Sequence, residues 1–166
     1  MKTWTSETWV PGAPEHVLEL LTEPAAIARW APIPFELLDL DGERLLAGTR
    51  ARVSGALAGR RLEFDVEIHE ADDERLSLVA HGPVSIGAEY LLAPADGGSD
   101  IRAAVSISGH GLLDGTLARA FEAVLAAGAL RASVARIGRE LQPAPADTNQ
   151  DHTRRSCTWP YRSLDC

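Results

Sequence analysis

Cysteine and long apolar runs are scarce in this sequence, and each shortage narrows the class of protein. The two cysteines, Cys157 and Cys166, both stand near the C-terminus, so the preceding chain has neither a thiol nor a disulfide. Such usage is typical of proteins from a reducing compartment. A Cys157–Cys166 loop would constrain only the last residues.

No apolar run approaches the roughly 20 residues of a membrane span, and residues 123–130 form one of the longest. The N-terminal residues 1–5 lack the apolar core of a secretory signal. We therefore expect a cytoplasmic protein. The formal net charge of −8 argues against nucleic acid or an anionic membrane as a partner, because both select basic surfaces.

The length of 166 residues, with 45% hydrophobic and 24% charged residues, suits one globular domain. Residues 143–166 are polar and aperiodic, and they follow the last periodic segment. We expect a domain over residues 1–142 and a flexible tail over 143–166. The sequence carries no direct signal of oligomeric state.

The first 40 residues alternate strand and helix signals. Residues 3–10 favour a strand, which Pro11-Gly12 ends. Pro14 and Pro24 each suit the first turn of a short helix, the second ending at Trp30. Residues 35–40 favour a second strand.

Residues 48–109 predict five further strands from their alternation of apolar and polar residues. In the first hairpin, pairing Val53 with Leu62 also places Arg52 opposite Glu63. This register predicts one apolar face and one face of alternating opposite charges.

Residues 112–141 then change to helical spacing with no proline, which predicts one long helix. Gly128 falls near its buried stripe, either to pack closely on the sheet or to leave room for a ligand.

The fold class is therefore α+β: a curved antiparallel sheet of six to seven strands wrapped around a long C-terminal helix, with two short helices after strand 1. Such a layout often leaves a pocket. Any single inward residue is more often ordinary core than pocket wall. Strand parity and position select the expected lining: Trp30, Phe35, Thr49, Val53, Phe64, Val66, Leu78, Tyr90, Val105, Leu117 and Phe121.

Several of these residues also resemble a known family. The matching residues near the N-terminus are Val10, Ala13-Pro14, Val17, Leu21, Pro24 and Trp30-x-Pro32, and those further along are Gly48, Gly59-Arg60, Arg75-Leu76 and Tyr90-x-Leu92-x-Pro94. Together they resemble the SRPBCC (START-like, birch-pollen-allergen-like) superfamily in its polyketide cyclase/dehydratase branch. The resemblance covers about residues 3–141 and implies a helix-grip fold. It also implies an internal pocket, but no fixed catalytic set, since the superfamily includes cyclases, aromatases and lipid carriers.

Two residues are candidates for catalysis. Tyr90 would place a phenol in an apolar cavity, where it needs a partner such as a ligand carbonyl, unless its hydroxyl reaches backbone or solvent. His110, between Gly109 and Gly111, is either a proton shuttle at the cavity mouth or a solvated residue at the helix start.

Other chemistries have little support in the sequence. Glu67 and His69 share a strand face but lack a third ligand, so we predict no metal site. There is no nucleophile elbow and no phosphate-binding glycine loop. We expect no cofactor.

Three functions remain open. The first is a cofactor-independent cyclase or dehydratase that acts on a hydrophobic, oxygenated or aromatic small molecule, with Tyr90 donating to an enolate. The second is a non-catalytic carrier of such a molecule. The third is a domain that docks a partner through its outer face or its long helix.

Overall fold

The computed structural model describes residues 1–57, 59–109 and 114–143. In chain order its elements are β1 (Lys2–Pro11), α1 (Pro14–Thr22), α2 (Pro24–Trp30), β2 (Phe35–Leu40), β3 (Arg50–Leu57), β4 (Arg60–Ala71), β5 (Arg75–His81), β6 (Ser85–Ala95), β7 (Gly98–Ser108), α3 (Asp114–Ala126) and α4 (Ala129–Glu140). His110 lies outside the described residues, as does nearly all of the predicted tail.

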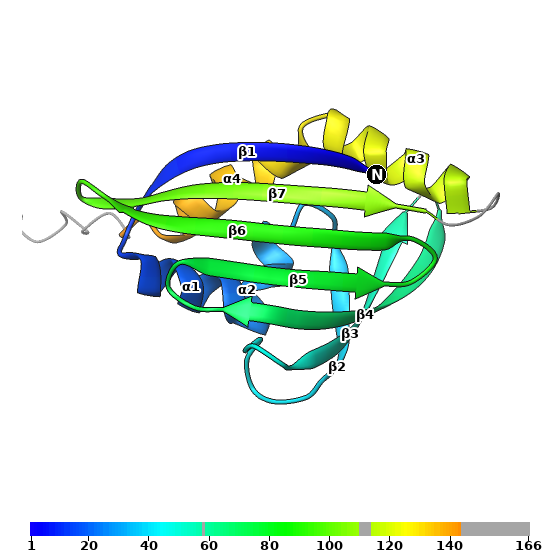
Figure 1. Ribbon diagram of the computed structural model, residues 1–166, viewed down its shortest axis with the longest axis horizontal. Helices are drawn as coiled ribbons and strands as arrows, with labels where there is room; N and C mark the ends of the chain where they lie inside the picture. The colour runs from blue at the N-terminus through cyan, green and yellow to red at the C-terminus, as the bar shows by residue number, and fades with distance from the viewer. Residues whose placement is uncertain (58, 110–113, 144–166) are drawn as a thin grey trace, which may run out of the picture.

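The seven strands form one antiparallel sheet in the order β1-β7-β6-β5-β4-β3-β2. The predicted fold class is confirmed: the sheet curves, and the helices lie behind it in the view of Figure 1. Consecutive strands pair from β2 to β7, while β1 pairs with β7 at the other edge. The connection from β1 to β2 carries α1 and α2 across to the far edge of the sheet.

Two prolines set the starts of the short helices, as the sequence predicts. Pro14 and Pro24 stand in the first turns of α1 and α2, where a missing N–H costs no hydrogen bond. Val17 and Leu21 of α1, together with Ile27 and Trp30 of α2, are buried. These side chains direct both helices against the inner face of the sheet.

The β3–β4 hairpin corrects the predicted register. Val53 pairs with Phe64 and not with Leu62, a shift of two residues, and the last pair before the turn is Leu57 with Arg60. Gly59, with φ of 75°, adopts the left-handed conformation that glycine tolerates best. Because side chains alternate with a period of two, the shift preserves both faces.

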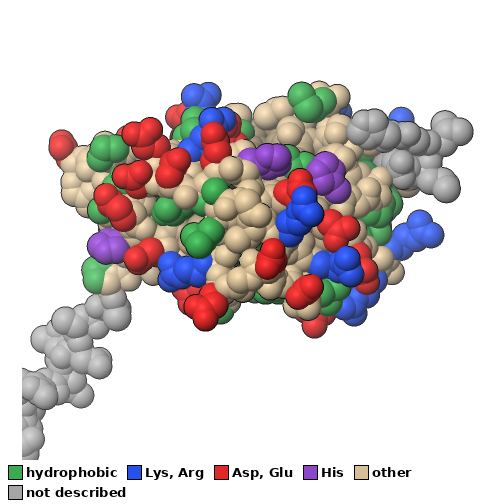
Figure 2. Space-filling view, turned by 60° about the horizontal axis from the view of Figure 1, so that its bottom comes forward, with side chains coloured by type: hydrophobic (Ala, Val, Ile, Leu, Met, Phe, Trp, Pro, Cys, Tyr) green, Lys and Arg blue, Asp and Glu red, His purple; other side chains and the backbone are tan. Residues whose placement is uncertain are grey.

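The outer face carries the predicted alternation of charge. In the observed register Arg52 Nε lies 3.1 Å from Asp65 Oδ1, and Arg50 Nη2 lies 2.8 Å from Glu67 Oε1. Figure 2 shows acidic and basic side chains interspersed over the visible surface. These exposed pairs each contribute little stability, and their main effect is to mark the solvent side of the sheet.

The predicted single C-terminal helix is wrong in one respect, because it is interrupted at Gly128. This residue has φ of 94° and separates α3 from α4. A left-handed residue ends the hydrogen-bond ladder of α3, and the amide of Ala132 then donates to the Gly128 carbonyl as the first bond of α4. Periodicity alone missed the break, since both segments keep helical spacing.

The core lies between α4 and the sheet. Leu130, Ser133, Val134 and Ile137 form the buried face of α4, which packs on β1 and β7. Arg136 Nη1 also donates to the carbonyl of Ala31, 3.1 Å away, and so ties α4 to the end of α2. No helix within the described residues is long and apolar enough to cross a membrane.

Candidate ligand cavity

The space between the sheet and its helices is not completely filled. A cavity of about 190 Å³ lies among α1, α2, the inner face of β2–β7 and α3. An engineered protein cavity of about 150 Å³ admits benzene. The volume therefore suits a guest of one or two rings, with any further length passing out through the mouth.

The burial of side chains on the central strands supports this void. Leu78 of β5 and Ala88 of β6 pair with each other in the middle of the sheet, and both line the cavity. In a filled core such inward positions would be closed, yet both remain only partly buried. By contrast Ala103 of β7, also on the inner face but outside the cavity lining, is completely buried.

Most of the predicted pocket residues surround this cavity. The structure brings together Trp30, Phe35, Val53, Phe64, Val66, Leu78, Tyr90, Val105 and Phe121. Thr49 and Leu117 are not part of the lining. Thr49 precedes β3, and its hydroxyl donates to the carbonyl of Leu46 at 2.7 Å. Leu117 is partly buried against the core one helical turn before Phe121.

Sequence reasoning missed the part of the lining that comes from irregular segments. Pro32, Ile33 and Pro34 connect α2 to β2, and Leu45 lies in the loop before β3. Hydrophobic periodicity does not extend to such residues. The dense Trp-x-Pro-x-Pro pattern of residues 30–34 was the available signal, because rigid apolar turns often border a pocket.

The mouth of the cavity lies between this connection and the β3–β4 hairpin. Pro34, Leu37 and Ala56 line the cavity and are also exposed to solvent, while Phe35 and Leu57 are partly exposed. Since β2 is an edge strand, this side of the cavity has only one layer of chain around it. A guest would enter past an apolar rim.

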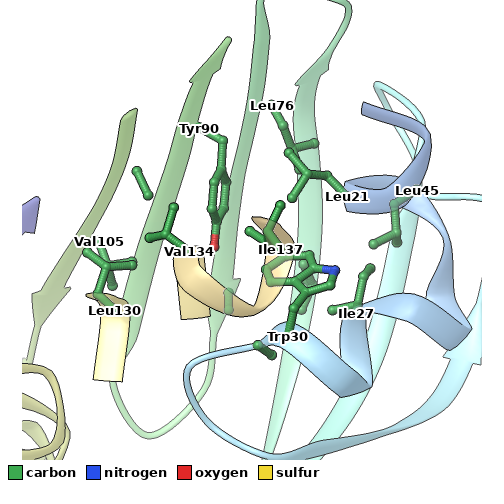
Figure 3. Packing of buried hydrophobic residues seen from close by; sticks show 14 of the residues in the cluster. Leu21, Ile27, Trp30, Leu45, Leu76, Tyr90, Val105, Leu130, Val134 and Ile137 are labelled. Atoms are coloured by element: carbon green, nitrogen blue, oxygen red, sulfur yellow. The ribbon is translucent and has the colours of Figure 1, made fainter. Parts of the chain in front are cut away.

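Tyr90 is the most distinctive residue of the lining. It comes from β6, is 3% exposed, and points from the sheet toward α4 (Figure 3). Its ring meets that of Trp30 edge to face, with centroids 5.7 Å apart and planes at 80°. This contact with α2 fixes the orientation of the phenol.

The polar groups around Tyr90 are few. The Trp30 indole Nε1 donates to the carbonyl of Leu20 at 3.4 Å, so it is already engaged. Burial raises the pKa of the Tyr90 phenol, and the neighbouring Ser133 hydroxyl offsets part of that rise. Ser133 Oγ nevertheless has no hydrogen-bond partner among the described residues. Tyr90 is thus neutral at physiological pH and available as a hydrogen-bond donor.

The rest of the described lining limits the chemistry. Apart from Tyr90 it contains no ionisable side chain, and the described residues include no cluster of three or more His, Cys, Asp or Glu that could hold a metal ion. His69 and His81 are exposed on the sheet and do not line the cavity. The arrangement can therefore bind an apolar molecule and donate one hydrogen bond to it.

Comparison with known proteins places this geometry in a family. The family model described as "Polyketide cyclase / dehydrase and lipid transport" matches residues 1–142. The chain belongs to this family. The match coincides with the described fold, and it agrees with the SRPBCC resemblance of the sequence.

Solved structures confirm the fold of this polyketide cyclase/dehydrase and lipid transport family member. Protein CV1439 from Chromobacterium violaceum is 18% identical with a TM-score of 0.66, and the alignment covers 87% of this chain and all of that one. TTHA0849 from Thermus thermophilus is also 18% identical with a TM-score of 0.63, covering 84% and 97% of the two chains. DynU16, a protein in the dynemicin biosynthetic locus, is 16% identical with a TM-score of 0.56, covering 85% of this chain and 47% of its own. Among curated proteins no significant match is found.

Proposed function

We propose that this protein binds a hydrophobic small molecule, oxygenated or aromatic, within the cavity between its sheet and helices. The observation that carries the proposal is an apolar cavity of about 190 Å³ in which Tyr90 supplies the one free donor of the described lining. Ligand sites are commonly apolar with a few polar groups that orient the guest. Both substrate classes in the family description, polyketides and lipids, have this chemistry.

Between the two roles open to such a site, the described lining favours a carrier. An aldol cyclisation needs a base that removes a proton next to a carbonyl. The Tyr90 phenol cannot serve, because its raised pKa keeps it protonated. A carrier needs only shape and one hydrogen bond.

A second candidate is a cofactor-independent cyclase or dehydratase. The observation that favours it is the same phenol, since a neutral donor in an apolar site can stabilise a developing enolate oxygen. A polycarbonyl chain has acidic methylene groups, and folding it in a tight cavity lowers the entropic barrier to ring closure. His110, the proton shuttle expected from the sequence, remains a prediction for this role.

Native mass spectrometry of the freshly expressed protein tests the proposal and separates its two forms. We expect a co-purifying small molecule that is released on unfolding. Recovery of that molecule unchanged after prolonged incubation supports the carrier, whereas its conversion supports the enzyme. The proposal fails if the protein carries no ligand and also binds none of a panel of one- and two-ring ketones and phenols at millimolar concentration.

Single-residue variants then test the roles of Tyr90 and His110. Tyr90→Phe should weaken binding of an oxygenated ligand about tenfold, the value of one neutral hydrogen bond. In a cyclase it should lower kcat as well as affinity. His110→Ala should lower turnover only in the enzymatic case. Unchanged affinity and turnover in Tyr90→Phe would remove this phenol from the site.

A further inference from the structure

Ser133 is a buried polar group that the fold itself does not explain. Its side chain is completely buried on α4, yet its Oγ has no hydrogen-bond partner among the described residues. An unsatisfied hydroxyl inside a protein is costly, and such groups are uncommon unless they have a task.

The usual solution for a hydroxyl in a helix is to donate to the carbonyl four residues earlier. Thr22 does so in α1, where its Oγ1 donates to the carbonyl of Leu18 at 2.8 Å. Ser133 could make the same bond to Ala129 but does not. Its hydroxyl is therefore directed elsewhere.

The arrangement of α4 shows where it is directed. Ser133 lies one turn before Ile137 and one turn after Leu130, on the face that packs against the sheet. In Figure 3 the Tyr90 oxygen points toward this same face, beside Val134 and Ile137. The Ser133 hydroxyl lowers the pKa of the phenol, which burial raises. Tyr90 and Ser133 thus both belong to the contact between β6 and the buried face of α4.

The two groups differ in their access to a guest. Tyr90 lines the cavity, whereas Ser133 does not. No described residue engages the Ser133 hydroxyl, and this hydroxyl lowers the pKa of the Tyr90 phenol, as a donor to the phenol oxygen would. Once that bond forms, the phenol proton must point away from Ser133, and the cavity lies in that direction.

Building on the proposed function, we propose that Ser133 is a positioning residue. Its hydroxyl donates a hydrogen bond to the Tyr90 oxygen and accepts none from it. Tyr90 then directs its own proton toward the guest. The site then selects molecules that carry a hydrogen-bond acceptor, such as a ketone or quinone oxygen, at the Tyr90 end. The chain of two hydrogen bonds, from Ser133 to Tyr90 and from Tyr90 to the guest, strengthens both members.

Two ligands with one ring skeleton test this directly: 1-tetralone, which has a carbonyl acceptor, and tetralin, which has a methylene at that position. Dissociation constants are measured by calorimetry on the full chain, and the carbonyl stretch of bound 1-tetralone by infrared spectroscopy. The wild-type protein should prefer 1-tetralone roughly tenfold, as one neutral hydrogen bond allows, and should shift the carbonyl band to lower frequency.

Ser133→Ala should reduce this preference to about threefold or less, with tetralin affinity within a factor of about two of wild type. The band shift should shrink in the same variant, which a purely structural role of the serine would not cause. Tyr90→Phe should abolish both preference and shift. Ser99→Ala is the matched control: Ser99 is also completely buried, but its hydroxyl donates to the Gly12 carbonyl at 2.7 Å, away from the cavity. It should leave the preference unchanged.

The possible results distinguish a failure of the Ser133 role from a failure of the proposed binding function. If the wild-type protein binds neither ligand, the proposed function fails for this class of guest and the role of Ser133 fails with it. If it binds both equally with an unshifted carbonyl band, cavity binding stands and the directed Tyr90 proton is refuted. If the preference survives unchanged in Ser133→Ala, Tyr90 acts alone and the serine has no positioning role. Ser133→Ala should fold, because in the structure the change removes a hydroxyl that no described residue bonds.

Discussion

Filling the cavity with a larger side chain should make the protein more stable and unable to bind. Ala88 is the best position for this change. It lies in the middle of β6, lines the cavity, and pairs with Leu78 and Val105 on the neighbouring strands. A leucine there would extend into a void of about 190 Å³, and its added atoms are fewer than those of the benzene that about 150 Å³ accepts.

The size of the effect follows from the three added carbon atoms. At about 0.8 kcal/mol each their burial contributes about 2.4 kcal/mol, from which about 0.5–1 kcal/mol of side-chain entropy is lost. Ala88→Leu should therefore raise the free energy of unfolding by about 1.5 kcal/mol, which corresponds to about 5 °C in Tm for a domain of this length. The same substitution should weaken binding of 1-tetralone at least about tenfold.

The assay combines thermal unfolding with calorimetric binding, and Ala103→Leu is the matched control. Ala103 is completely buried on β7 next to Tyr90 and does not line the cavity. Its replacement overpacks the core and should cost about 1–3 kcal/mol. If Ala88→Leu destabilises the protein as much as Ala103→Leu, the space beside Ala88 is already filled and there is no cavity at that position.

Three further predictions concern stability. Because the pKa of Tyr90 is raised above 10.0 in the folded state, its neutral form stabilises the fold fully below pH 10, and this contribution is lost as the pH rises toward the folded pKa. Chemical denaturation should show that the free energy of unfolding falls between about pH 10 and 11, by about 1 kcal/mol more in wild type than in Tyr90→Phe. If the free energy of unfolding depends on pH in the same way in both proteins, the phenol is not buried. Gly128→Ala should lower Tm by about 3 °C or more, since alanine is strained at φ of 94°; an unchanged Tm would mean that α3 and α4 merge without cost. Gly82→Ala should lower the free energy of unfolding by about 2 kcal/mol and weaken ligand binding, because the added Cβ would lie 2.6 Å from Phe64 Cδ1 and 2.7 Å from the Glu63 carbonyl oxygen. Unchanged stability and affinity would show that Phe64 has room to move.

Much of this fold could be predicted because its signals are local. Alternation identified the strands, and Pro14 and Pro24 identified the starts of α1 and α2. The hairpin register was harder. Pairings that differ by two residues keep the same faces and offer the same choice of opposite charges, so parity could not decide whether Val53 pairs with Leu62 or Phe64. In the structure the hairpin closes with Leu57 paired to Arg60.

The predicted part of the site lies on regular elements, although other lining residues on such elements, such as Ile27 and Leu125, were not predicted. Strand parity placed Phe64, Val66 and Tyr90 on the inner face, and all three line the cavity. Thr49 has the right parity but precedes β3, where a loop carbonyl takes its hydroxyl. Ser133 gave no signal, because its importance depends on what α4 packs against, and this is a property of tertiary structure.

The interruption at Gly128 has a consequence for how such proteins diversify. A single straight helix would have to follow one line across the sheet, whereas the break at Gly128 lets α4 lie along β1 while α3 takes its own course against β1, β3 and β7. Phe121 and Leu125 belong to α3 and line the cavity. A single residue that never touches the guest therefore sets the angle of one wall, and a change of backbone there can recontour the chamber without replacing any side chain inside it.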